Sequence, residues 1–409
     1  MTFNDNTGSN DKDDAALSTP LSVDSTEFEE VYGESLSNAL DLSTWTSGIN
    51  LEDLYSRIGD EQVVEALKFE ASAKPFIRKH IFSRFAGRKE AAPGAGVYAA
   101  TRAQVERTHK GLLFTGAVEA ADGTHFAHET IPLTVNQIGV CTISYSGDQG
   151  TYMHRLYRRD LRAGVVDDLD RLIELMDRRM QRSNSGSENE GGDLSRLARR
   201  GIMAYAERAV LLQKCTAPWR MGHGNPTPYE LLTGSGSMEL LTRSLDVLHD
   251  LLIGHKRWLF VPSEPNDRVL LTIGQALEPL EYAIVETATS SMRRITDAGS
   301  YDRRYETMVG EFVREVGPKI VRGVYRASRM APPYIFYAHA DYAHEAALIA
   351  IADGTMHEHR GFPMLIDLAD RICAATFGAH SLATQMEVSY AGQGVPFEYL
   401  PERATRKWQ

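Results

Sequence analysis

The chain has 409 residues, of which 43% are hydrophobic and 24% are charged, and its formal net charge is −11. This length allows one large domain or two ordinary ones with a substantial apolar core. No stretch approaches the ~18 consecutive apolar residues of a membrane-spanning helix, and no charged-then-apolar leader opens the chain. We therefore expect neither a membrane protein nor a secreted one.

The negative charge is concentrated near the N-terminus. Residues 1–45 hold ten acidic residues and one base, Lys12, so they carry −9 and the other 364 residues carry only −2. Because residues 1–44 are also rich in Ser, Thr and Asn, we predict a disordered acidic tail followed by a folded body over 45–409. The nearly neutral body does not exclude a polyanionic substrate.

In the first half of the chain, apolar spacing predicts a mainly helical segment over 51–90 and a buried strand over 111–121. The β-branched segment 130–146 predicts further strands, in antiparallel pairing. A helix is expected at 165–181, then a flexible loop near 182–193 (RSNSGSENEGGD), then a helix over 194–214.

The second half alternates in the same way. The expected elements, in chain order, are a strand at 230–233, a helix at 238–253, a strand at 258–262, a helix at 301–330 broken at Pro318, strands at 334–338 and 345–352, and a helix at 364–377. Because strands and helices alternate without a regular β-α-β count, we predict an α/β fold with a mixed sheet flanked by helices.

The three cysteines, Cys141, Cys215 and Cys373, are odd in number and far apart. They provide neither a disulfide framework nor a paired-cysteine zinc site. This usage is typical of a reducing compartment, and we expect the protein in the cytoplasm.

Three acidic residues are candidates for chemistry. Asp122 follows an apolar strand directly, where ligands gather in open α/β sheets, although an ordinary Asp-Gly turn is the alternative. Glu207 borders the apolar stripe of its helix, and either a metal or an ion pair with Arg200 or Arg208 would satisfy it. Asp370 shares a helix face with Ile366 and Cys373, which points it inward, unless it forms a salt bridge with Arg371 or another base.

Two further patterns bear on function. Arg155, Arg158 and Arg159 lie in the densest basic cluster of the body, with tyrosines between them, and could bind phosphates while the aromatic rings stack on bases. A solvated amphipathic element is the alternative. The histidines form two loose groups, Asp122-x-x-His125-x-x-His128 and His339-x-Asp341-x-x-His344, but neither matches a zinc spacing.

Taken in order, these segments resemble the NurA nuclease family over roughly residues 95–400. Ala121-Asp122-Gly123-Thr124 is similar to a strand that ends in Asp-Gly-Ser in that family, and Glu207 lies on a helix where the family places an acidic ligand. Gly361-Phe362-Pro363…Leu368-Ala369-Asp370 is similar to the family's closing Gly-Tyr-Pro…Leu-Ala-His helix.

The resemblance implies an RNase H-like sheet and cleavage of DNA ends with Mn²⁺ or Mg²⁺ held by Asp122, Glu207 and Asp370. It also implies a homodimer that works beside a HerA-type hexameric ATPase, in DNA end processing or in defence against foreign DNA. Arg155, Arg158 and Arg159 would contact the DNA.

Two departures from the family pattern matter. Asp370 stands in place of the terminal histidine, and Thr233, in Leu231-Leu232-Thr233-Gly234-Ser235, stands where a second acidic residue is expected after a strand. Either Glu230, Glu264 or Asp267 supplies that carboxylate, or the chain binds DNA and a partner without cutting.

Three hypotheses follow. The first is a metal-dependent DNA nuclease, which a converged cluster of Asp122, Glu207 and Asp370 would favour. The second is a non-catalytic adaptor with a degenerate nuclease fold that binds DNA or an ATPase, which distant or arginine-bound carboxylates would favour. The third is another metal-binding hydrolase, which would need His339, Asp341 and His344 to meet.

Overall fold

The computed structural model describes residues 25–45, 51–129, 133–147, 152–160, 200–264, 267–297 and 303–395. The chain divides into two compact units, residues 1–70 and 71–409. The expected helix at 165–181 and the expected loop at 182–193 lie outside the described residues. No helix in the described ranges is long and apolar enough to cross a membrane.

The first unit is helical where it is described. Its helices are α1 (Ser25–Tyr32), α2 (Leu36–Leu40), the 3-10 turn Leu42–Thr44, α3 (Glu52–Arg57), the π-helical turn Ile58–Val63 and the start of α4 (Val64–Phe76). Ser35 caps α2, because its hydroxyl accepts a hydrogen bond from the Asn38 backbone N–H at 3.2 Å. Residues 25–44, expected to be disordered, are thus largely helical, and the boundary predicted at 44/45 stays a prediction.

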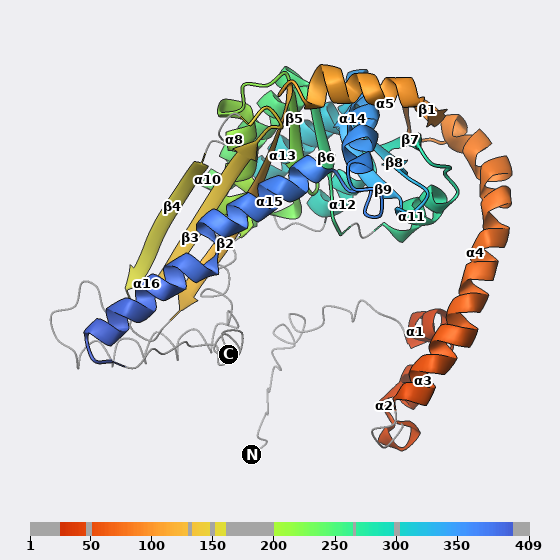
Figure 1. The fold of residues 1–409 in the computed structure, drawn as a ribbon, viewed down its shortest axis with the longest axis horizontal. Helices are drawn as coiled ribbons and strands as arrows, with labels where there is room; N and C mark the ends of the chain where they lie inside the picture. The colour runs from red at the N-terminus through yellow and green to blue at the C-terminus, as the bar shows by residue number, and fades with distance from the viewer. Residues whose placement is uncertain are drawn as a thin grey trace, which may run out of the picture. The chain divides into compact units, whose positions relative to one another are not determined.

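The second unit is built on one nine-stranded sheet in the order β1-β7-β8-β9-β6-β5-β2-β3-β4 (Figure 1). The strands are β1 (Ala91–Ala99), β2 (Val118–Glu129), β3 (Leu133–Ile143), β4 (Tyr152–Asp160), β5 (Trp219–His223), β6 (Trp258–Val261), β7 (Glu281–Thr287), β8 (Ile320–Tyr325) and β9 (Tyr334–His339).

The strand directions show which part of the sheet has a known arrangement. β2, β3 and β4 are antiparallel, whereas β5 runs parallel to β2, and β6 runs parallel to β5. Three antiparallel strands followed by two parallel ones, in the order β4-β3-β2-β5-β6, make an RNase H-like sheet, as expected. β9, β8, β7 and β1 continue the sheet beyond β6 in antiparallel pairing.

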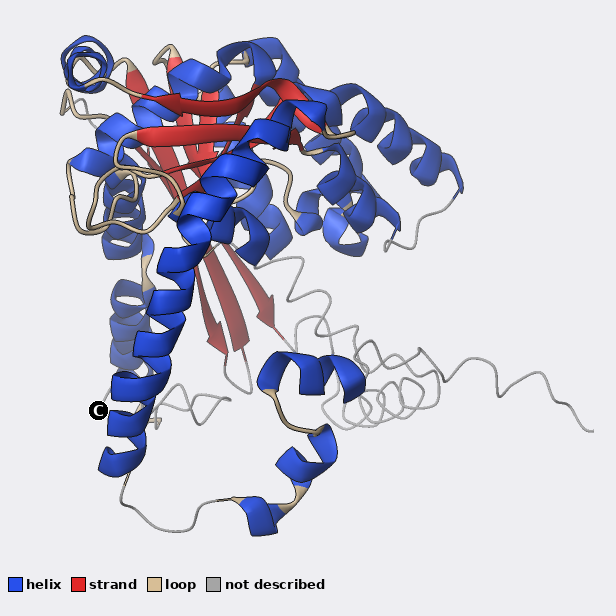
Figure 2. Cartoon of the chain, turned by 90° about the vertical axis from the view of Figure 1, so that its right-hand side faces the viewer, coloured by secondary structure: helices blue, strands red, loops and turns tan. Residues whose placement is uncertain are grey.

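Helices cover both faces of the sheet, and each face has its own apolar core (Figures 1 and 2). One face packs against α5 (Arg102–Thr108), α14 (Ala343–Thr355) and α15 (Met364–Phe377). The other packs against α8 (Ile202–Gln213), α10 (Met238–His249), α11 (Arg268–Gln275), α12 (Thr289–Asp297) and α13 (Arg303–Val316). Burial on both sides explains why β6, Trp-Leu-Phe-Val, has no polar residue.

Several predicted elements are confirmed, and four are wrong. The predictions for β3, α10, β6, β9 and α15 hold. Residues 109–113 form a π-helical turn, so β2 begins only at Val118; residues 229–232 form the short helix α9, not a strand. The helix expected over 301–330 ends at Val316, before Gly317-Pro318, and strand β8 follows.

The fourth error is the strand expected at 345–352, which is helix α14 (Ala343–Thr355). Its sequence, AHEAALIAIADGT, is rich in alanine, the residue with the highest helix propensity. Most of the helix is buried, so its apolar residues do not follow a one-sided helical period. The sequence pattern therefore could not separate a buried helix from a strand.

Close packing at one glycine sets the position of α15 on the sheet. A Cβ atom at Gly139 of β3 would lie 2.1 Å from the ring of Phe377, so only glycine leaves room for that side chain. Nearby, the Cys373 thiol donates a hydrogen bond to the Gly139 carbonyl at 3.3 Å. These contacts hold α15, and Asp370 on it, against β2 and β3.

The other end of α15 is fixed by a buried carboxylate. Asp353 of α14, which is fully buried, accepts hydrogen bonds from the Tyr145 hydroxyl at 2.5 Å and from the Leu365 backbone N–H at 2.9 Å. The second bond satisfies a free N–H in the first turn of α15. Burial raises the pKa of Asp353 to about 6, although these two hydrogen bonds act to lower it.

This raised pKa predicts a pH-dependent contribution to stability. The folded state holds the Asp353 proton more tightly than the unfolded chain, so this contribution is full below the ordinary value of 3.8 and is lost as pH rises through about 6. Asp353→Asn should therefore remove a pH-dependence on the order of 1–3 kcal/mol. Urea unfolding of both proteins at pH 4, 5 and 8 measures it; parallel pH profiles would contradict the assignment.

Candidate active site

Asp122 lies inside strand β2 and is only 3% exposed. The Asp-Gly turn that the sequence allowed is wrong, because β2 continues to Glu129 in unbroken pairing with β3. Its parallel partner is shorter, however: the paired residues end with Ala121 opposite Gly222, and β5 stops at His223. Asp122 therefore lies where the parallel pairing ends, although its own strand goes on.

His223 is the next residue of β5, and its ring lies beside Asp122. Its Nδ1 lies 3.4 Å from Asp122 Oδ1, and its Nε2 lies 2.8 Å from the Ser263 hydroxyl. Burial lowers the pKa of His223, but the bond to Asp122 and the charges of Glu207 and Asp370 outweigh it and raise this pKa. Our sequence analysis missed His223; its signal was a His-Gly pair directly after a short apolar segment.

Glu207 approaches Asp122 from α8, which covers the face of the sheet opposite to α15. A Cβ atom at Gly123 would lie 2.6 Å from Glu207 Oε1, so the glycine after Asp122 is what allows the helix carboxylate to come this close. The Gly123 backbone N–H donates a hydrogen bond to this carboxylate. Burial raises the pKa of Glu207 to about 7, Arg208 acts against this, and the negative charge of Asp122 adds to it.

Arg208 binds both Glu207 and the chain that follows β5. One of its guanidinium nitrogens, Nη1, forms an ion pair with Glu207, and Nη2 donates to the Asn225 carbonyl at 2.6 Å. The guanidinium group also lies over the ring of Phe260, 5.3 Å from its centre. The ion pair that the sequence offered as an alternative for Glu207 is thus present.

Asp370 completes the group from α15. The residue is exposed, so the inward direction expected from the helix pattern is wrong; it lies at the border of the helix face. Partial burial raises the pKa of Asp370, and the charge of Asp122 raises it further. The expected alternative, a salt bridge to Arg371, is not found: Arg371 Nε pairs with Asp367 at 3.1 Å.

The three predicted carboxylates and His223 therefore share one electrostatic environment, and each lies close enough to shift the ionisation of another. Among the residues that the structure describes, no three His, Cys, Asp or Glu side chains converge closely enough to hold a metal ion. The acids are neighbours, but they do not meet at one point in this arrangement.

The other candidates for an acidic residue have different partners. Thr233 ends α9, where its hydroxyl donates to the Tyr229 carbonyl at 2.8 Å, so it is not the end of a strand. Asp267 caps α11 and pairs with Arg322 at 2.7 Å. Glu264 lies in a pocket that begins at His223, and Glu230 lies on α9.

The histidine groups do not form a second site within the described ranges. The Asp341 carboxylate lies 3.6 Å from His339 Nδ1 and pairs with Lys256 at 3.1 Å, and His339 Nδ1 also accepts the Asp341 backbone N–H. His344 shares a hydrogen bond of 2.9 Å with the Tyr282 hydroxyl. His125 contacts Asn136 on the neighbouring strand.

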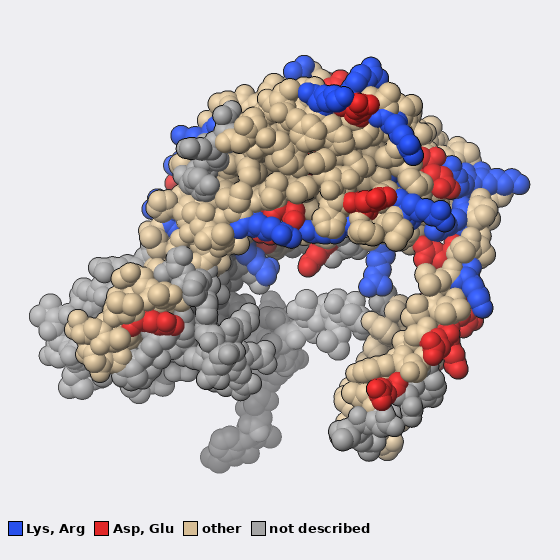
Figure 3. Space-filling view, in the orientation of Figure 1, with Lys and Arg blue, Asp and Glu red and all other residues tan. Residues whose placement is uncertain are grey.

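The basic cluster lies on strand β4, at one edge of the sheet, and not on a helix. Arg155 is exposed there. Arg158 and Arg159 follow it in the same strand. On the face shown in Figure 3, Lys and Arg side chains are mixed with Asp and Glu side chains and form no continuous basic surface.

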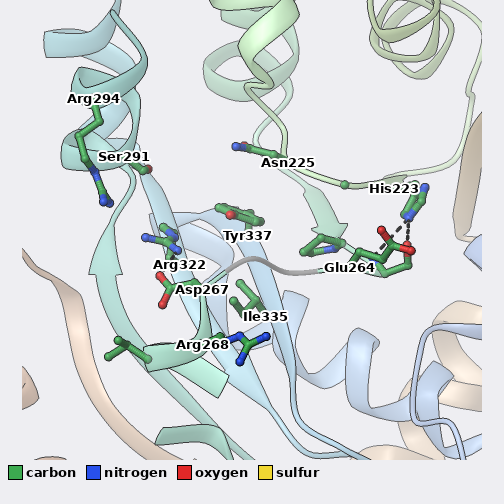
Figure 4. Close-up of a pocket in the computed structure, with 14 residues that line it drawn as sticks. His223, Asn225, Glu264, Asp267, Arg268, Ser291, Arg294, Arg322, Ile335 and Tyr337 are labelled. Carbon is green, nitrogen blue, oxygen red and sulfur yellow. Dashed lines mark hydrogen bonds and ion pairs between the residues drawn. The ribbon is translucent and has the colours of Figure 1, made fainter. Parts of the chain in front are cut away.

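A pocket of about 820 Å³ opens beside the site (Figure 4). It begins at His223 and Asn225 after β5 and passes the segment after β6. At its far side it is lined by residues of α11, α12, β8 and β9. Three arginines lie along it: Arg268, Arg294 and Arg322. The candidate site therefore borders a cavity and is not a closed cluster.

Comparison with known proteins gives a likeness in fold and none in sequence. No protein-family model and no curated protein matches the chain. The NurA nuclease from Sulfolobus solfataricus is similar, with a TM-score of 0.48 and 7% identity, over 87% of this chain and 100% of that one.

Two other crystal structures are more distant. NurA with manganese has a TM-score of 0.35 and 9% identity, over 71% of this chain and 95% of that one. Endonuclease V from Bacillus subtilis has a TM-score of 0.29 and 12% identity, over 66% of this chain and 82% of that one. By its strand order and directions the chain has an RNase H-like α/β fold, and in fold it is similar to the NurA nucleases.

Proposed function

We propose that the protein is a divalent-metal-dependent deoxyribonuclease that hydrolyses phosphodiester bonds. The observation that carries this proposal is the approach of Asp122, Glu207 and Asp370, with His223, at the end of the parallel strands of an RNase H-like sheet. The three acids come from a strand and from helices on opposite faces, and packing alone gives no reason to bring them together.

The donor set fits a hard divalent cation. Three carboxylates and one imidazole suit Mn²⁺ or Mg²⁺, and the buried carboxylates Asp122 and Glu207 are favourable only beside a positive charge. Asp122, Glu207 and Asp370 would hold the ion. When bound, it would supply activation of a water molecule and charge stabilisation at the leaving oxygen.

Other side chains position this group. Arg208 neutralises Glu207 and fixes the chain after β5, so it orients two members of the site at once. Gly123 lets Glu207 reach the strand.

The missing second acid has a simple account. In the family pattern an acidic residue follows the second strand and a histidine lies on the last helix. Here the strand parallel to β2 ends in His223-Gly224, and the last helix supplies Asp370. We propose that aspartate and histidine have exchanged positions, so that the set of donor types is kept without Thr233.

Replacing Asp122 tests the proposal. Asp122→Asn keeps the size of the side chain and removes its charge, so cleavage of end-labelled linear DNA should fall by about 100-fold or more. The assay compares Mn²⁺, Mg²⁺ and EDTA, with and without a HerA-type ATPase. Asp246→Asn, at an exposed position of α10, is the matched control.

Cleavage that persists in EDTA or in Asp122→Asn would reject this site. If the unaltered protein cleaves no DNA under any condition, with the ATPase present, the nuclease proposal is rejected.

The exchange of His223 and Asp370 makes a separate prediction. His223→Asp should raise Mg²⁺-supported cleavage relative to Mn²⁺-supported cleavage, since carboxylates suit Mg²⁺ better than imidazole does. The ratio of the two rates is the measurement, because a general loss of folding would lower both rates together. An unchanged ratio would show that His223 does not contact the ion.

A second candidate function is a non-catalytic adaptor that binds DNA or an ATPase. Two observations favour it: Glu207 is paired with Arg208, and no metal-holding group is formed by the described residues. The same cleavage assay separates the two functions.

We also propose DNA as the substrate, contacts to it from Arg155, Arg158 and Arg159, a homodimer, a HerA-type ATPase partner, and a cytoplasmic role in DNA end processing or defence. Within the first unit, exposed large apolar side chains such as Trp45, Leu67 and Phe69 support a protein partner. Sedimentation at two concentrations should give the mass of a dimer; a monomer at both would exclude it.

A further inference from the structure

On one side, the pocket beside His223 is lined by an arginine, Arg322, that is already held in ion pairs. Arg322 of β8 is 5% exposed and pairs with Asp267 at 2.7 Å and with Glu286 at 2.6 Å. Its guanidinium group lies 5.8 Å from the ring centre of Tyr337, which also lines the pocket. Two carboxylates therefore already engage Arg322, so its charge is not available to a further anion.

The two other arginines are different. Arg268 at the start of α11 and Arg294 on α12 are both exposed and both line the pocket. Neither forms an ion pair or a side-chain hydrogen bond with any residue in the described ranges. Opposing them, only Glu264 is an acid of the lining outside the Arg322 pair. The pocket thus presents two guanidinium groups available to an anion.

The neutral lining and the size narrow the class of ligand. Asn225 and Ser291 add hydrogen-bonding groups, and Tyr337 and Ile335 add aromatic and apolar surface. Figure 4 shows His223 and Glu264 at one end, with Arg294 and Arg322 at the other. A volume of about 820 Å³ is in the range of about 300–1,000 Å³ that holds small molecules, and it exceeds what one phosphate needs.

We propose that this pocket binds the nucleic-acid strand next to the bond that is cut, with Arg268 and Arg294 each contacting a phosphate. The inference rests on the proposed nuclease function, because the pocket opens at His223. The pocket has two arginines on different helices, Arg268 and Arg294, the aromatic ring of Tyr337, and an opening to solvent. This lining matches a chain of phosphates and bases better than a single compact anion. Arg322 lines one side of the pocket and is not an anchor.

Binding in EDTA tests the pocket without cleavage. Fluorescence anisotropy measures the affinity of the full-length protein for a labelled single-stranded DNA oligonucleotide at several salt concentrations. For the double variant Arg268→Ala/Arg294→Ala we expect affinity to fall at least about 10-fold, and the slope of log affinity against log salt to become shallower by about 1.4, or about 0.7 for each lost phosphate contact. A single-stranded RNA oligonucleotide of the same sequence, measured in the same way, shows whether the pocket binds DNA in preference to RNA.

The control is Arg293→Ala. Arg293 is exposed on α12 beside Arg294 but does not line the pocket, so affinity and salt slope should stay as in the unaltered protein. Circular dichroism confirms that the variants are folded. Equal affinity and slope in the double variant, an equal loss in Arg293→Ala, or no binding by the unaltered protein would overturn the proposal.

The binding test of the pocket and the cleavage test of the proposed nuclease can succeed or fail independently. Strand binding that depends on Arg268 and Arg294, in a protein that never cuts, would keep the pocket and reject catalysis. Cleavage that depends on Asp122, with binding indifferent to both arginines, would keep the nuclease and reject the pocket.

Discussion

The parallel pairing between β2 and β5 fixes the site. Because β5 is short and stops one residue after Gly222, the side chains of Asp122 and His223 become neighbours just beyond the last paired position, Ala121 opposite Gly222. β2 itself continues with β3 alone, so the sheet opens on one side of Asp122. The helices on both faces then bring Glu207 and Asp370 to that opening, and the pocket begins at the same place. The length of one strand thus decides where every other group can act.

Placing acids together in a folded protein costs stability, and the structure offsets that cost locally. Burial and mutual repulsion favour protonated Glu207, while Arg208, held by the chain after β5, favours the charged form. The same arginine therefore ties the charge state of a helix residue to the position of a loop. A cluster of acids that needs such compensation is more typical of a functional site than of a structural core.

Sequence alone predicted a large part of this arrangement. Asp122, Glu207 and Asp370 were named from the order of short motifs, and the fold places them within electrostatic reach of one another, although they do not meet at one point. The strand β5 was missed, and with it His223, because five residues between helices give too few alternations to establish a period. Thr233 was misplaced for the same reason. The inward direction of Asp370 failed because a residue at the border of a helix face can turn either way.

The close packing of Gly139 against Phe377 has a consequence for how the protein tolerates inherited variation. Gly139 carries no side chain and takes no part in the proposed chemistry, yet an added methyl group there would move α15 against the sheet. A change of Gly139 to a larger residue, which would be harmless on an uncovered strand, would then displace Asp370, which lies further along α15. The set of positions at which a mutation abolishes function is therefore wider than the set that contacts substrate, and it includes residues that a search for reactive side chains passes over.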